Sequence, residues 1–96
     1  MLDVPMEIDV RRLHGGEADA NTARQIAAEF AGNNVTPKHA AAFLRDRNNY
    51  LIVAEAGETI AGFLSAHRLE RFKDTRSKMF IYEVDVAVQW QPRRRP

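Results

Sequence analysis

The sequence comprises 96 residues, of which 45% are apolar and 28% are charged, and it contains no cysteine. A chain of this length forms one small domain, and the lack of cysteine excludes disulfides and zinc sites built from thiolates. No stretch approaches the roughly 20 apolar residues that a transmembrane helix needs, so no membrane partner is expected. The N-terminus lacks the basic and then apolar segments of a secretion signal, which makes the cytoplasm the expected location.

Positive charge is concentrated near the C-terminal end. The net charge is +1, but three of the basic residues are consecutive at 93–95, and residues 1–92 hold eleven basic and thirteen acidic residues. A nucleic-acid-binding surface spreads its basic residues over a face or along a stripe. We therefore expect one domain over residues 1–92, a basic tail over residues 93–96, and no nucleic-acid partner.

The first half of the chain predicts one strand and two helices. Apolar and polar residues alternate over residues 6–13, which is typical of a half-exposed strand. Apolar residues then recur with helical spacing over residues 17–32, and Asp19 or Asn21 is available as the N-terminal cap. A threonine followed by proline predicts the start of a second helix over residues 36–47.

The second half predicts three strands. Residues 50–54 form an apolar run rich in strand formers, and Gly57 supplies the positive φ of a tight hairpin that returns along residues 59–69. Gly62, inside the returning strand, marks a close approach of another backbone or a large ring. The last strand is predicted over residues 79–88, so the order is β-α-α-β-β-β.

The last strand carries two acidic residues on one face. Alternation places Glu83 and Asp85 about 6.6 Å apart along the strand, and a carboxylate in such a pair can accept a proton from a reacting amine. The alternative is that this face is simply solvated. The alternation assigns Met79, Ile81, Glu83, Asp85 and Ala87 to one face and Phe80, Tyr82, Val84, Val86 and Val88 to the other.

The other candidate residues give weaker signals. His14, His39 and His67 form no i, i+4 pair, so no metal site is expected. His67 lies on the strand beside that of Asp85, but its spacing assigns it no catalytic role. Trp90 follows the last strand with little chain left to cover its ring, which predicts an exposed contact surface.

The run Tyr82-Glu83-Val84-Asp85-Val86-Ala87-Val88, with the order of elements before it, resembles the fourth strand of the GNAT superfamily of acetyl-CoA-dependent N-acetyltransferases. With the segment 49–55 and Gly62-Phe63, it is most similar to the aminoglycoside 3-N-acetyltransferases. The resemblance covers residues 6–95 and about the first half of the family's fold. It implies an α+β fold, a four-stranded, mainly antiparallel sheet with two helices on one face.

The resemblance also implies an activity, the transfer of acetyl from acetyl-CoA to a primary amine, which could belong to an aminoglycoside-like molecule. Asp85 or Glu83 would accept the proton of the amine. The backbone of Val86, Ala87 and Val88 would hold the acetyl carbonyl and the pantetheine arm.

The resemblance stops before the glycine-rich pyrophosphate loop of the family. Arg93 and Arg94 fall on the loop's basic positions, and Pro96, which has no N–H for a phosphate, stands where its first glycine belongs. We therefore expect a truncated domain that binds acetyl-CoA weakly or not at all.

Two functions remain open from the sequence: an acetyltransferase, or a non-catalytic oligomerising or binding module that retains the half-fold. In either case the strand over residues 79–88 would be left as an unpaired edge. We expect a homodimer or larger oligomer that forms through this strand and Trp90.

Overall fold

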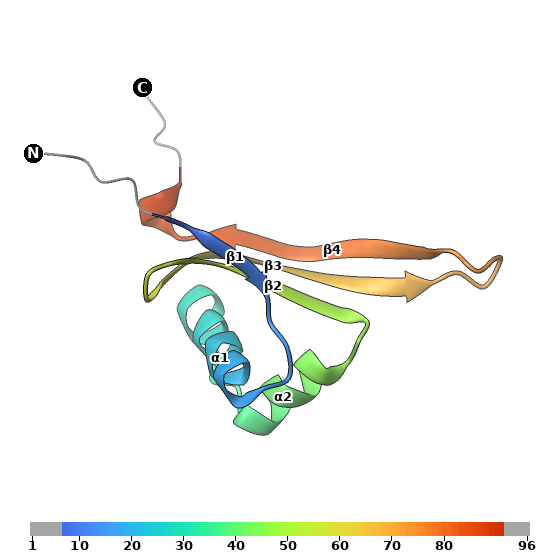
Figure 1. Cartoon of the computed structure of the whole chain (residues 1–96), viewed down its shortest axis with the longest axis horizontal. Coiled ribbons are helices and arrows are strands. Elements are labelled where there is room, and N and C mark those ends of the chain that lie inside the picture. Colours follow the sequence, from blue (N-terminus) through green and yellow to red (C-terminus); the bar gives the residue numbers. More distant parts are fainter. Residues whose placement is uncertain (1–6, 92–96) are drawn as a thin grey trace, which may run out of the picture.

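The computed structural model describes residues 7–91 and confirms the predicted α+β class and element order (Figure 1). The chain forms one layer of strands and one layer of helices. The elements are β1 (Asp9–Arg12), α1 (Glu17–Ala31), α2 (Pro37–Arg45), β2 (Asn49–Ala56), β3 (Thr59–Glu70), β4 (Ser77–Val86) and the short 3-10 helix η1 (Val88–Trp90).

The four strands form one antiparallel sheet in the order β1-β2-β3-β4, so neighbours in the chain are neighbours in space. Both helices lie against the same face of this sheet, here called the helix face (Figure 1). The core lies between the two layers and is built around six buried side chains, those of Leu13, Ile26, Leu44, Leu51, Val53 and Ile60. The opposite face, here called the open face, is covered by no helix among residues 7–91.

The two helices begin differently. In α2, the Thr36 hydroxyl accepts a hydrogen bond from the His39 N–H (3.1 Å), as predicted for a threonine before proline. In α1, the prediction of a cap at Asp19 or Asn21 is wrong, because the cap residue is Gly16 and no side chain caps the helix. Asp19 instead lies in the first turn of the helix.

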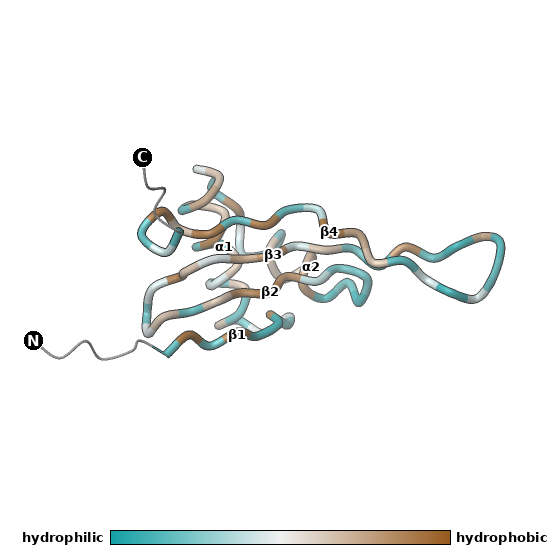
Figure 2. Tube along the Cα trace, turned by 90° about the horizontal axis from the view of Figure 1, so that it is seen from above, coloured by the Kyte–Doolittle hydropathy of each residue, from teal (hydrophilic) through white to brown (hydrophobic). Residues whose placement is uncertain are grey.

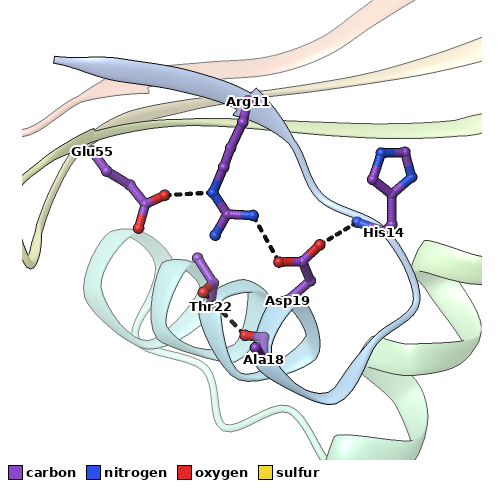
Figure 3. A network of polar contacts seen from close by, with 6 residues as sticks. All are labelled: Arg11, His14, Ala18, Asp19, Thr22 and Glu55. Carbon is purple, nitrogen blue, oxygen red and sulfur yellow. Dashed lines mark hydrogen bonds and ion pairs between the residues drawn. The ribbon is translucent and has the colours of Figure 1, made fainter.

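The Asp19 carboxylate joins α1 to β1 and to the loop between them (Figure 3). It accepts a hydrogen bond from the Arg11 guanidinium at 2.7 Å and another from the His14 N–H at 2.8 Å. Arg11 also donates to Glu55 on β2 at 2.7 Å. Partial burial opposes ionisation of Asp19, but the hydrogen bonds from Arg11 and His14 outweigh it and lower the pKa of this carboxyl.

The hairpin between β2 and β3 turns at a glycine. Gly57 adopts a φ of 61° in the β2–β3 hairpin, which confirms the predicted left-handed turn position. The β3–β4 hairpin is longer and projects beyond the helices, as both views of the chain show (Figures 1 and 2). Strand β1 covers only part of the predicted range 6–13, of which residue 6 lies outside the described residues.

Strand β4 contains a bulge that changes the predicted faces. Ser65 pairs with Glu83 and the next β3 residue, Ala66, pairs with Ile81, so Tyr82 is an extra residue. The prediction that Met79 and Ile81 share a face with Glu83 is therefore wrong. The two apolar side chains lie on the open face, whereas Glu83 lies on the helix face.

The open face of the sheet is largely apolar at its two outer strands. Its exposed side chains there are Val10, Met79, Ile81, Val84 and Val86. Val84, one of these side chains, is 66% exposed in the described chain.

The end of β4 also differs from the prediction. The strand ends at Val86 instead of Val88, because the chain turns into η1 and the Trp90 N–H donates to the Ala87 carbonyl at 2.8 Å. This turn half-buries the Trp90 ring, so the prediction of an exposed ring is wrong; its Nε1 is buried without a partner among residues 7–91. Neither helix of these residues has the length and hydropathy needed to cross a bilayer.

Candidate functional site

A cavity of about 670 Å³ lies between the two helices and the β3–β4 side of the sheet. Its walls are mainly apolar and aromatic, and the Phe30 and Phe63 rings meet edge to face in it at 5.1 Å between centroids. Helix α2 contributes Phe43 and His39, and β3 contributes Ser65 and His67. A cavity of this size with few polar groups is typical of a site for a small organic molecule.

The two predicted carboxylates lie at the β4 side of this cavity. Glu83 pairs with Ser65, and Asp85 pairs with Phe63, and because paired residues point to the same face, both acids lie on the helix face. Both are exposed, and none of the described residues that line the cavity is Lys or Arg. Two carboxylates without a basic neighbour in the lining favour a cationic ligand.

The Asp85 carboxylate also occupies a backbone donor. Its Oδ1 accepts a hydrogen bond from the N–H of Val86 at 2.8 Å. The Ala87 N–H donates to the Ala61 carbonyl on β3. Backbone groups of successive strand residues point in opposite directions, so the N–H and the carbonyl of Val86 point to the free edge of the sheet. Gln91 Nε2 donates to the Val86 carbonyl at 2.7 Å, so exposed side chains satisfy both groups.

Among the described residues predicted to hold acetyl-CoA, Val86 is the one whose backbone groups are bonded to exposed side chains. The Ala87 N–H is committed to the β3 backbone, and the Val88 carbonyl accepts from the Gln91 N–H at 3.2 Å in η1. At Val86, a ligand can replace the exposed side chains of Asp85 and Gln91 without breaking the sheet. Arg93 and Arg94 lie outside the described residues.

Gly62 brings β3 and β4 close together beside the carboxylates. A Cβ at this position would lie 2.7 Å from the Asp85 carbonyl oxygen and 3.4 Å from the Val86 Cα. The close approach predicted from Gly62 is thus confirmed, and the approaching group is the backbone of β4. Any side chain here would displace Asp85.

His67 is a polar residue of the cavity to which the sequence assigned no catalytic role. Its Nδ1 lies 2.8 Å from Asn49 Oδ1 on β2, and its ring meets the rings of Phe43 and Tyr82 edge to face. The strand order alone placed His67 beside β4. The partnership with Asn49 could not be found from spacing, because it depends on the β2–β3 register that sets the two residues opposite each other.

Several solved structures to which this chain is similar are acetyltransferases. An aminoglycoside acetyltransferase from an uncultured soil metagenomic sample matches with a TM-score of 0.75 and 23% identity, over 92% of this chain and 63% of its own. A second from an uncultured soil sample matches at 0.72 and 25% identity, over 88% and 59%. The ribosomal-protein-alanine N-acetyltransferase from Brucella melitensis biovar Abortus 2308 matches at 0.67 and 19%, over 86% and 59%.

These likenesses confirm the expected fold: the chain has the β-α-α-β-β-β part of the GNAT acetyltransferase fold. It spans about 60% of the length of the acetyltransferases that it matches. No protein-family model and no curated protein matches the sequence.

Proposed function

We propose that this chain carries the amine-binding part of an N-acetyltransferase, which transfers acetyl from acetyl-CoA to a primary amine. One observation carries the proposal. Glu83 and Asp85 lie on the helix face of an edge strand, beside a cavity whose described lining contains no Lys or Arg. The likeness to solved acetyltransferases supports the same reaction class.

The acceptor that we propose is an amine of the aminoglycoside type. A primary amine is a cation at neutral pH, and two carboxylates attract it to this side of the cavity. One of the similar acetyltransferases was solved in complex with sisomicin, an aminoglycoside that carries several amines. The apolar walls formed by Phe30 and Phe63 would contact the less polar faces of the acceptor.

The residues of β4 would act on both partners of the transfer. When bound, acetyl-CoA would supply the acetyl thioester, and the Val86 N–H is the backbone donor suited to its carbonyl oxygen. The nitrogen of the amine forms the new C–N bond, the C–S bond breaks, and the sulfur leaves with the bonding electrons. Asp85 or Glu83 accepts the proton that the nitrogen loses, directly or through water, and the leaving thiolate is protonated in turn.

The hydrogen bond between Asp85 and Val86 connects these two roles. In the structure, the carboxylate of Asp85 occupies the N–H that a carbonyl oxygen would need. A carbonyl that took this N–H would release Asp85 Oδ1 to face the amine. The proton acceptor would therefore become available when the acetyl donor is in place.

Two measurements test the proposal. Calorimetric titration with acetyl-CoA should show weak binding, and the release of free thiol should report acetyl transfer to sisomicin. The D85N variant should lower the rate about 10²-fold, which is the scale of a lost general base. E58Q, which removes an exposed acid at the β2–β3 turn, is the matched control and should leave the rate unchanged.

The non-catalytic alternative gives the opposite results. A module that uses this half-fold only to bind or oligomerise would release no heat with millimolar acetyl-CoA and no thiol with sisomicin. A D85N variant as active as E58Q would remove Asp85 from the mechanism while leaving the acetyltransferase proposal to Glu83.

A further inference from the structure

His67 lies in the wall of the cavity in an environment that controls its ring. It stands on β3 opposite Asn49 of β2, and its ring is half-buried between Phe43, at 6.1 Å between centroids, and Tyr82, at 5.6 Å. Both neighbours present their rings at steep angles, 83° and 70°. The imidazole therefore has aromatic contacts on two sides and one polar contact, with Asn49.

The side-chain amide of Asn49 has a determined orientation. Its Nδ2 donates to the carbonyl of Phe43 at 3.1 Å. Rotating the amide by half a turn would set an oxygen against that carbonyl, and two acceptors would face each other. Oδ1 is therefore the atom that faces His67.

This orientation selects one tautomer of the imidazole. Asn49 Oδ1 can only accept, and it lies 2.8 Å from Nδ1, so Nδ1 must carry the hydrogen. In the neutral ring, Nε2 then holds a lone pair. Among residues 7–91, Nε2 makes no hydrogen bond, and the His67 side chain lines the cavity together with Tyr82 of β4.

We propose that His67 Nε2 receives the ammonium group of the acceptor amine and takes its first proton, and that Asn49 positions the ring for this role. The proposal rests on the proposed function. A protonated amine must lose one proton before its nitrogen can attack, and a second when the C–N bond forms. His67 takes the first and becomes an imidazolium that still donates from Nδ1 to Asn49, and a carboxylate of β4 takes the second.

The cavity contains the groups that this division of labour needs. The titratable side chains among its described lining are His39 of α2, His67 of β3, and Tyr82, Glu83 and Asp85 of β4. Of these, His67 is the one whose free ring nitrogen is determined by a half-buried amide partner, Asn49. The carboxylates attract the cation, and the imidazole supplies a neutral acceptor beside them.

Nuclear magnetic resonance of the imidazole nitrogens tests the tautomer without any need for catalysis. At a pH where the ring is neutral, His67 should show a protonated Nδ1 and an unprotonated Nε2, whereas the exposed His14 should show an average of both tautomers. N49D loses the donor to the Phe43 carbonyl but keeps an acceptor oxygen opposite Nδ1, so it should preserve the tautomer of His67. N49L removes the acceptor and should let the tautomers average. A protonated Nε2 in the wild-type chain would overturn the proposal.

Addition of sisomicin tests the contact with the amine. The Nε2 resonance of His67 should shift in the wild-type chain, and that of His14 should not. An unchanged Nε2 resonance at saturating sisomicin would overturn the proposal. If sisomicin shifts Nε2 but no acetyl is transferred, the proposed function fails while the amine contact of His67 stands.

The rate of acetyl transfer tests the proton role. H67Q keeps a polar side chain of similar length and should lower kcat by about 10²-fold with little change in KM, and it should remove the acid limb of the pH profile. N49D should retain most of the activity, whereas N49L should lose it. An H67Q variant with the wild-type rate and pH profile would show that the imidazole accepts no proton.

Discussion

Replacement of Gly62 by alanine should destabilise the domain and displace the candidate site together. The added Cβ would lie 2.7 Å from the Asp85 carbonyl oxygen, 0.7 Å closer than the 3.4 Å at which ordinary contact begins. The obstructing atom belongs to the backbone of β4, so no side-chain rotation relieves the contact. The strand must move away from β3, and Asp85 must move with it.

The size of the effect follows from the cost of overpacking. Inserting a methyl group into a tightly packed position typically costs about 1–3 kcal/mol. In a domain of 60–100 residues, each 1 kcal/mol lowers the melting temperature by about 4–8 °C. We therefore expect G62A to melt roughly 5–20 °C below the wild-type chain when unfolding is followed by circular dichroism.

A second glycine provides the matched control. Gly16, the cap residue of α1, has ordinary backbone angles, and a Cβ there would meet no atom within 4 Å. Serine is also a favoured cap residue, so G16S should change the melting temperature by about 3 °C or less. If G62A melted like G16S, with the amide resonances of Asp85 and Val86 unchanged, the close approach of the strands would not constrain the site.

Three further predictions follow from the charges and the exposed surfaces. Because the pKa of Asp19 is lowered in the folded state, this carboxylate stabilises the fold at any pH above its unfolded-state pKa, which is about 3.9. The stabilisation is lost as the pH falls through the lower folded-state pKa. D19N should therefore be less stable at neutral pH, and its stability should depend less on pH in acid. We propose that a second copy of this chain covers the free edge and the open face of β4. Sedimentation at micromolar concentration should then show a dimer, and the double variant I81K/V84K, changed at two exposed positions, should be a monomer. A monomeric wild-type chain would refute this. If Arg93 and Arg94 attract acetyl-CoA only as exposed charges, its affinity should fall steeply between low and about 0.1 M salt, where the screening length is about 10 Å, and an affinity that does not depend on salt would show a specific pocket.

The order of elements could be predicted because each depends on local patterns. Helical spacing, the threonine before Pro37, and the glycine of the β2–β3 turn all act within a few residues, and the structure confirms them. The role of Asp19 could not be predicted in this way. Its partners, Arg11 and His14, lie on β1 and in the loop before α1, and an acidic residue near a helix start is equally typical of a cap.

The candidate site could be predicted in part. The pairing of Glu83 and Asp85 on one face holds, because the two residues follow the bulge and alternate regularly with Val84 between them. The remainder of that face could not be predicted, because the bulge at Tyr82 carries no glycine or other local mark. Its position is set by how β4 pairs with β3.

This bulge determines which surface the carboxylates serve. On the hairpin side of Tyr82, Phe80 pairs with His67 and lies on the helix face. If Tyr82 were paired regularly with β3 instead of forming a bulge, strict alternation from Phe80 would put Glu83 and Asp85 on the open face and turn Val84 toward the helices. The extra residue reverses this arrangement. It places the acids beside the cavity that His67 also lines, where an amine can reach them, and it leaves Val84 and Val86 on the open face, exposed among residues 7–91.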